Sequence, residues 1–273
     1  MVVAVSSVQF GAALAKSLFD EVGAGSTVFL RVLFAALVLL AVWRPALAGR
    51  SPADWRLIAV FGLTLAGMNL AFYESLERIP LGIATTFEFV GPLGVAIAGS
   101  RRPVDLVWVV LAGSGIALLS DFGSADLDRL GVALALLAGG FWAAYILLSA
   151  RVGRTFPGAS GLALAMAAGA VMLAPVGIAD ARGDLLVPEV LAVAVAVAVL
   201  SSAIPYTLEM EALRRLPVGV FGVMMSIEPA VAALAGFIVL DEGLATRELV
   251  AILLVVAATA GAARNAHVPP RDA

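Results

Sequence analysis

Long apolar stretches alternate with short polar segments along the whole chain. Each stretch is roughly 17 to 25 residues long, which is the length of an α-helix that crosses a bilayer. The pattern predicts an all-α membrane protein in which short loops join ten transmembrane helices, with no soluble domain. The predicted helices cover approximately residues 2–19, 27–43, 57–76, 81–99, 104–120, 130–150, 159–179, 190–212, 216–240 and 248–264.

Two of the predicted helices carry a glutamate near the middle of an apolar run: Glu88, one turn before Pro92, and Glu228, directly before Pro229. An acidic side chain at the centre of a bilayer costs about 2.5 to 3.5 kcal/mol, so such residues are rare and usually functional. Pro92 has no amide proton for the carbonyl of Glu88, which leaves a side chain and a backbone oxygen free at one level of the helix. The pattern therefore predicts a polar site within the membrane.

The composition supports a membrane protein and argues against several other classes. The chain has 273 residues, of which 62% are hydrophobic and 14% charged, whereas a soluble domain has about 25% charged residues. It contains no cysteine, and its single histidine, His267, lies in a polar tail, so we expect no metal site and no cofactor. The net charge of -3 gives no general attraction to nucleic acid. A phosphate-binding loop with its glycines and lysine is also absent, so ATP is not the expected energy source.

Arginines are concentrated in every second predicted loop. Loops rich in arginine and lysine lie in the cytoplasm, so this alternation orients the helices and places both termini in the cytoplasm. The opposite loops contain mostly acids, such as Asp20, Asp126 and Glu242. The arginines of the predicted cytoplasmic loops are Arg44, Arg50, Arg56, Arg101, Arg102, Arg151, Arg154, Arg214, Arg215, Arg264 and Arg271.

An internal repeat relates the two halves of the chain. Residues 74–82 align with residues 211–219, with glutamate, leucine, arginine, proline and glycine at matching positions, and Pro92 then falls on Pro229. The repeat unit contains five predicted helices, and because five is odd, the second copy enters the membrane from the opposite side. We therefore expect two inverted halves, residues 1–123 and 124–273, with a substrate site between them.

Short motifs occur in a fixed order along nearly the whole chain. They are AKSLF at 15–19, GMN at 67–69, EFVGP at 88–92, SRRPVD at 100–105, WAAYI at 142–146, PYTLEM at 205–210 and SIEPA at 226–230. In this order they resemble the threonine/homoserine exporters of the EamA branch of the drug/metabolite transporter superfamily. The resemblance implies two EamA repeats of five helices, a location in the bacterial inner membrane and efflux of small neutral amino acids. The sequence lacks the short basic leader that is typical of the family before its first helix.

Two cations occur at similar depth in successive predicted helices, Lys16 near the end of the first and Arg31 near the start of the second. Side chains of this length commonly reach from a helix end to the membrane surface. If both turned inward instead, they would hold a substrate carboxylate, and the planar guanidinium of Arg31 would suit a bidentate contact. Asn69, inside the third predicted helix, would either link helices or contact the substrate.

Trp142 and Tyr145 lie three residues apart on one face of the sixth predicted helix, where their rings could contact an ammonium group. Tyr206 is a third candidate for substrate binding. The commoner role of such residues is in the aromatic belts at the membrane surface. Glu209, nearly one turn beyond Tyr206, also merits mutation, although it lies close to a helix end. Glycines such as Gly139 allow helix backbones to approach each other closely.

These residues predict a secondary transporter without enzymatic activity, and with the resemblance to the EamA exporters they lead us to expect export of small neutral amino acids, driven by proton antiport. A carboxylate in a low-dielectric environment favours its protonated form, so Glu88 and Glu228 are candidates for substrate binding and for proton coupling. The alternative for both is a structural role as paired charges within the bundle. The expected partners are the lipid bilayer, an amino acid, protons and a second copy of the chain in a homodimer. Other functions remain open: export of another metabolite or drug-like compound, a channel, or an intramembrane enzyme, for which no nucleophile and base are evident.

Overall fold

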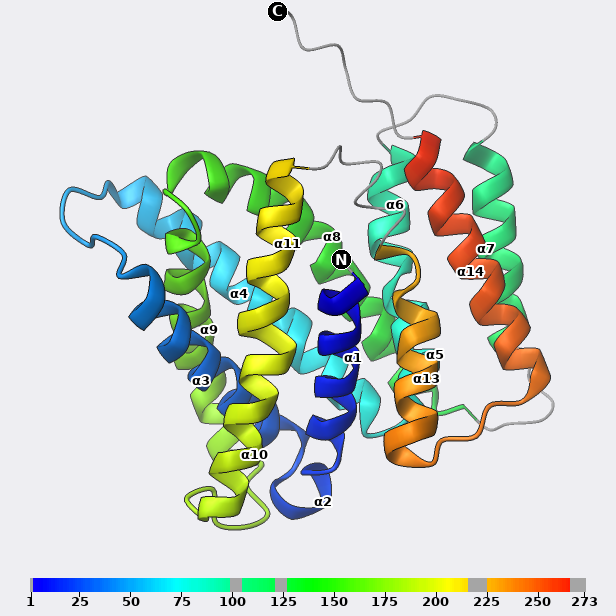
Figure 1. Ribbon diagram of the computed structural model, residues 1–273, viewed down its shortest axis with the longest axis horizontal. Helices are drawn as coiled ribbons and strands as arrows, with labels where there is room; N and C mark the ends of the chain where they lie inside the picture. Colours follow the sequence, from blue (N-terminus) through cyan, green and yellow to red (C-terminus); the bar gives the residue numbers. More distant parts are fainter. Residues whose placement is uncertain (1, 99–104, 121–126, 216–224, 266–273) are drawn as a thin grey trace, which may run out of the picture.

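The computed structural model describes residues 2–98, 105–120, 127–215 and 225–265. Within these ranges the chain is helical and contains no β-strand (Figure 1). Some positions named above lie outside the described residues. They are Arg101, Arg102, Asp126, His267, Arg271, residues 216–219 of the repeat, and the expected boundary between residues 123 and 124.

Local signals in the sequence explain where helices of the first half begin. Ser51 and Asp54 form a capping box, in which each side chain accepts a hydrogen bond from the backbone N–H of the other, and Pro52 follows as the first helical residue of α4. Gly23, with a φ of 86°, separates α2 from α3. The elements are α1 (Val2–Lys16), α2 (Phe19–Val22), α3 (Ala24–Trp43), α4 (Pro52–Leu76), α5 (Leu81–Glu88), α6 (Val90–Ala98) and α7 (Asp105–Ser120).

Helices of the second half show similar signals. Asp128 caps α8 by accepting a hydrogen bond of 2.9 Å from the backbone N–H of Gly131. Pro188 is the first residue of α10, which continues through a π-helical turn, η1, into α11. The elements are α8 (Arg129–Thr155), α9 (Ser160–Ala179), α10 (Pro188–Ala198), η1 (Val199–Ala203), α11 (Ile204–Arg215), α13 (Glu228–Leu240) and α14 (Thr246–Asn265).

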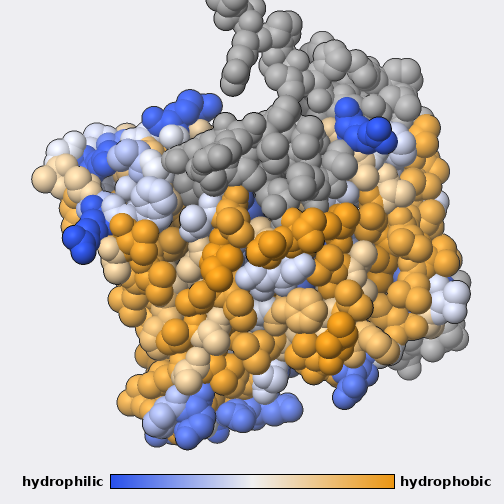
Figure 2. Space-filling model, viewed as in Figure 1, coloured by the Kyte–Doolittle hydropathy of each residue, from blue (hydrophilic) through white to orange (hydrophobic). Residues whose placement is uncertain are grey.

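Six helices in the described part of the chain are long and apolar enough to cross a membrane: α3, α4, α8, α9, the continuous segment from α10 to α11, and α14. Shorter apolar helices occupy residues 2–16, 81–95, 107–116 and 228–240. Figure 2 shows a broad hydrophobic band between hydrophilic residues at the upper and lower edges of the molecule. The protein is therefore a multi-pass membrane protein, as the apolar pattern predicts.

The helices form a single bundle. α4 packs against α8 and α9, α3 packs against α9, and α1 packs against α13, η1 and α11. On one side of the bundle, α7 packs against α14 (Figure 1). Small residues permit these approaches: there is no room for a Cβ at Gly91 of α6, because the backbone of Gly139 in α8 occupies the space.

The helical segment that contains Glu88 is broken near Pro92, as the proline predicts. α5 ends at Glu88 and α6 begins at Val90. The carbonyl oxygen that Pro92 leaves without a helical partner packs against α8, where a Cβ added to Gly139 would lie 2.5 Å from it. The break thus fixes the backbone of Glu88 against α8, while the side chain of Glu88 reaches the centre of the bundle.

Candidate functional site

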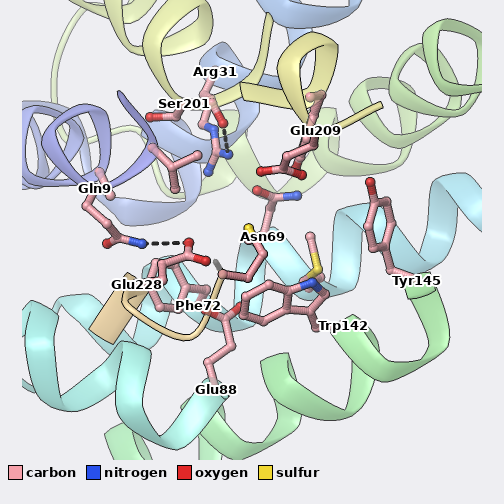
Figure 3. Close-up of a pocket in the computed structure, with 15 residues that line it drawn as sticks. Gln9, Arg31, Asn69, Phe72, Glu88, Trp142, Tyr145, Ser201, Glu209 and Glu228 are labelled. Atoms are coloured by element: carbon pink, nitrogen blue, oxygen red, sulfur yellow. Dashed lines mark hydrogen bonds between the residues drawn. The ribbon is translucent and has the colours of Figure 1, made fainter. Parts of the chain in front are cut away.

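A cavity of about 70 Å³ lies among the helices. Its walls come from α1, α3, α4, α5, α8, η1, α11 and α13, so both halves of the chain contribute (Figure 3). Of the residues that the sequence predicts for substrate binding, the structure brings together Arg31, Asn69, Glu88, Trp142, Tyr145, Tyr206 and Glu228. Lys16 does not line this cavity.

Arg31 of α3 is held by contacts with the second half of the chain. It is 6% exposed. Its Nε donates to the hydroxyl oxygen of Ser202 at 3.1 Å, and its Nη2 donates to the carbonyl oxygen of Ser201 at 2.9 Å. Its guanidinium carbon lies 5.2 Å from the centre of the Tyr73 ring. The two hydrogen bonds use two of five N–H donors and fix the guanidinium at the cavity wall.

Pro205 explains why a carbonyl is available to Arg31. Proline has no N–H, so Ser201, four residues earlier, and Leu200, five residues earlier, lose the partner that an α-helix or a π-helix would give them. Both oxygens are used by other helices. Arg31 donates to Ser201, and the hydroxyl of Ser7 donates to the carbonyl oxygen of Leu200 at 2.6 Å. The break at η1 therefore connects the second half of the chain to α1 and α3.

The two midmembrane acids lie at opposite kinds of helix end. Glu88 is the last residue of α5, and Glu228 is the first residue of α13. They are 8% and 5% exposed. The helix dipole stabilises a negative charge at an N-terminus and not at a C-terminus. Glu88 therefore lies at the break between α5 and α6, whereas Glu228 lies at the favourable end of α13.

Glu228 is also fixed by a side chain of the first helix. Nε2 of Gln9 donates to Oε1 of Glu228 at 2.8 Å. Gln9 is 2% exposed and lines the cavity. Glu209 of α11 lines the cavity as well, so three carboxylates and one guanidinium converge there. This concentration of ionisable groups inside a membrane bundle is typical of a transport site.

Aromatic residues form another part of the wall. Tyr145 stacks between Phe61, at a ring-centroid distance of 5.5 Å, and Tyr206, at 6.3 Å. Trp142 meets the ring of Phe89 edge to face at 4.8 Å. Trp142, Tyr145 and Tyr206 therefore line the cavity.

Asn69 lies on α4 at the cavity and is 4% exposed. Its Nδ2 donates to the carbonyl oxygen of Leu65 at 2.7 Å, within its own helix. This bond orients the amide, and the Asn69 side chain also forms a hydrogen bond with Tyr206 of α11.

Lys16 lies at the end of α1 and pairs with Glu242, which follows α13. Its Nζ is 2.6 Å from Oε1 of Glu242 and 3.3 Å from the carbonyl oxygen of Ile79. The other carboxylate oxygen of Glu242 accepts a hydrogen bond of 2.8 Å from the backbone N–H of Leu81, at the start of α5. Lys16 and Arg31 therefore do not form one carboxylate-binding pair. Instead, Lys16 ties α1 to α13 and α5 at one end of the bundle.

Sequence reasoning missed Gln9 and Ser201 as cavity residues, and it named Glu209 only as a further candidate. A signal exists for the first two. Gln9 is an amide in an otherwise apolar stretch, and Ser201 precedes Pro205 by one helical turn. Within the described ranges, no group of three His, Cys, Asp or Glu side chains is arranged to hold a metal ion.

Comparison with known proteins identifies the family. The chain matches the EamA-like transporter family over residues 129–264. It is 44% identical over 272 residues to the threonine/homoserine exporter RhtA of Escherichia coli strain K12, covering 96% of this chain and 89% of that protein. RhtA of Salmonella typhimurium strain LT2 is 43% identical with the same coverage. One crystal structure has the same fold, with a TM-score of 0.68 and 20% identity, covering 97% of this chain and 96% of the other. As the motifs indicate, the chain belongs to the EamA-like transporter family.

Proposed function

We propose that the protein exports small neutral amino acids such as threonine and homoserine from the bacterial cytoplasm by proton antiport. The observation that carries the proposal is the buried cavity in which Arg31 faces a set of carboxylates, because a zwitterion needs a cationic and an anionic partner. The relatives named threonine/homoserine exporters support the same substrate class and support transport over catalysis.

The size of the cavity favours an amino acid over a drug-like compound. Its volume is about 70 Å³, whereas pockets for drug-sized ligands are typically about 300 to 1,000 Å³. Arg31 supplies donors for a carboxylate, and Trp142, Tyr145 and Tyr206 enclose the remainder of a small substrate. Asn69 contributes an amide to the same wall.

Proton coupling is assigned to the two carboxylates at helix ends, with Glu88 as the leading candidate. Glu88 lies at the break between α5 and α6 that Pro92 imposes, and its side chain lines the cavity. A buried carboxylate in that position exchanges its proton when the cavity opens to water. Protonation from the acidic outside would release the substrate, and deprotonation toward the cytoplasm would allow it to bind again.

The proposed architecture is ten transmembrane helices in two inverted halves, residues 1–123 and 124–273, in the inner membrane with both termini in the cytoplasm. Helix packing supports it. In the register of the sequence repeat, α3 and α9 correspond and pack together, as do α7 and α14. The packing of α4 on α8 has its counterpart in that of α1 on η1 and α11. In the same register Asn69 falls on Tyr206, and both line the cavity. A pseudo-two-fold axis in the membrane plane would bring corresponding helices of the two halves together in this arrangement.

Export from proteoliposomes tests the function. Vesicles loaded with one of a panel of amino acids, or with a drug-like cation, are assayed with and without an inward proton gradient. We expect the gradient to accelerate efflux of threonine and homoserine, and external substrate to accelerate exchange, which a channel would not show. Glu88→Gln should abolish the proton-driven component and its pH dependence, with a weaker defect for Glu228→Gln. An unchanged rate and pH profile in Glu88→Gln would assign this residue a structural role.

Reporter fusions test the topology. A reporter after Arg264 should be cytoplasmic, and one inserted near Asp126 should be external. If both reporters were found on the same side of the membrane, the proposal of two inverted halves would be wrong.

A further inference from the structure

The hydrogen bond between Gln9 and Glu228 leaves two buried oxygens unused. Nε2 of Gln9 donates to Oε1 of Glu228, and this bond orients both groups. Oε1 of Gln9 and Oε2 of Glu228 are buried and have no hydrogen-bond partner among the described residues. Buried polar atoms in native proteins nearly always have partners, so an unpartnered pair at a cavity points to a ligand.

The chemistry of the two oxygens defines that ligand. Both are acceptors, and one belongs to a carboxylate, so the ligand must bring N–H or O–H donors and positive charge. A primary ammonium group supplies three donors and one charge. The position of Glu228 in the first turn of α13 stabilises the ionised carboxylate that such a group requires.

The position of Arg31 completes the assignment. Figure 3 shows Arg31 on one side of the cavity and the Gln9–Glu228 pair on another. Arg31 is oriented by η1, and Glu228 is oriented by α1, so the fold fixes a cationic and an anionic group independently. A zwitterion bound between these two groups has its carboxylate toward Arg31 and its ammonium group toward Glu228.

We propose that Gln9 and Glu228 form the subsite for the α-ammonium group of the substrate, which makes Gln9 a residue that determines specificity. The proposal rests on the proposed function, since it takes an amino acid as the substrate. The carbonyl oxygen of Gln9 and Oε2 of Glu228 accept hydrogen bonds from the ammonium, while the carboxylate lies toward Arg31. Glu88, whose side chain lines the same cavity, remains available for the proton.

Binding to purified protein in nanodiscs tests the subsite. The ligands are L-threonine, the analogue with a hydroxyl in place of the ammonium group, and L-threoninamide, which lacks the carboxylate. Wild-type protein should prefer threonine over both analogues. Gln9→Leu removes one acceptor, and we expect the preference over the deaminated analogue to fall about tenfold, equivalent to about 1.4 kcal/mol. The preference for threonine over threoninamide should not change, because the carboxylate that threoninamide lacks is bound by Arg31 in this proposal.

Ser7→Ala is the matched control, since it removes a polar group from α1 that bonds to Leu200 and does not line the cavity. Its preferences should equal those of wild type. The subsite would be overturned if Gln9→Leu kept the wild-type preference for threonine over the hydroxyl analogue. It would also be overturned if Gln9→Leu lost preference over both analogues to the same degree. Sodium-dependent binding of the deaminated analogue would also overturn it, by assigning the two oxygens to a metal cation. Failure of wild-type protein to bind threonine at all would overturn the proposed function itself.

Discussion

Replacement of Arg31 by lysine separates a carboxylate-binding role from a purely structural one. Both residues are cationic, so Arg31→Lys keeps the charge in the cavity. It removes the planar fork, because a lysine ammonium cannot bond to Ser201, bond to Ser202 and hold both oxygens of a carboxylate at once. The structure therefore predicts weaker substrate binding by a protein that still reaches the membrane.

The contacts of Arg31 set the size of the effect. Loss of one charge-assisted hydrogen bond to the substrate costs about 1.5 to 3 kcal/mol, which is a decrease in affinity of about 10-fold to 150-fold. Arg31→Ala goes further, because it also removes the donor 2.9 Å from the carbonyl oxygen of Ser201, to which Pro205, four residues later, offers no N–H. That orphaned buried oxygen costs about 1 to 3 kcal/mol of stability.

The assay is threonine binding by the purified protein, measured by calorimetry, together with its melting temperature. Arg44→Lys is the control, because Arg44 follows the same helix at an exposed position and its side chain donates to the carbonyl of Ala41. It should bind as wild type does. If Arg31→Lys binds threonine with wild-type affinity, Arg31 is a structural link between α3 and η1, and the carboxylate must be held elsewhere.

Two other changes address packing and gating. Gly139→Ala forces a Cβ to 2.5 Å from the carbonyl oxygen of Glu88 and should lower the stability of the protein by about 1 to 3 kcal/mol. The control is Gly140→Ala, which has nothing within 4 Å of the new Cβ and should melt at or above the wild-type temperature. Equal melting temperatures for the two variants would refute the close contact at Gly139. Glu242→Gln weakens the bond to Lys16, which lies at the outer end of the bundle in the proposed topology. The chain contains no cysteine, so a single cysteine introduced into the cavity can report access from outside. In the Glu242→Gln background this cysteine should react with an external thiol reagent about tenfold faster than in the wild-type background. An unchanged labelling rate would show that the pair does not control access.

Much of the fold follows from the sequence because the apolar length of a membrane helix is a local property. The predicted ranges overlap the observed helices, and the break between Glu88 and Val90 follows from the missing amide proton of Pro92. The position of Glu228 inside an apolar run was also legible, since a charge there requires an internal partner, whereas the sequence left open whether Arg31 turns inward. These inferences need only the residue and its immediate neighbours.

The partners of these residues were not legible, because they come from distant parts of the chain. Lys16 and Arg31 have similar depth in sequence, yet Lys16 meets Glu242 while Arg31 meets Ser201. Gln9 is uncharged, so the sequence alone does not mark it as a site residue; its role depends on its hydrogen bond to Glu228. Packing across the bundle decides which helix faces contact each other. A helix that is apolar on all sides has little hydrophobic periodicity from which its contact face could be predicted.

The break before Pro205 also bears on how the two halves can move. The carbonyls of Leu200 and Ser201 belong to the second half, and the donors Ser7 and Arg31 belong to the first. These bonds span the contact between the halves at the level of the cavity, whereas the Lys16 pair spans it at one end. A rocking motion requires large displacements at the ends and almost none at its axis. In the proposed architecture of two inverted halves, the bonds from Ser7 and Arg31 to these carbonyls would act as a pivot, around which the ends separate while a bound substrate keeps its depth.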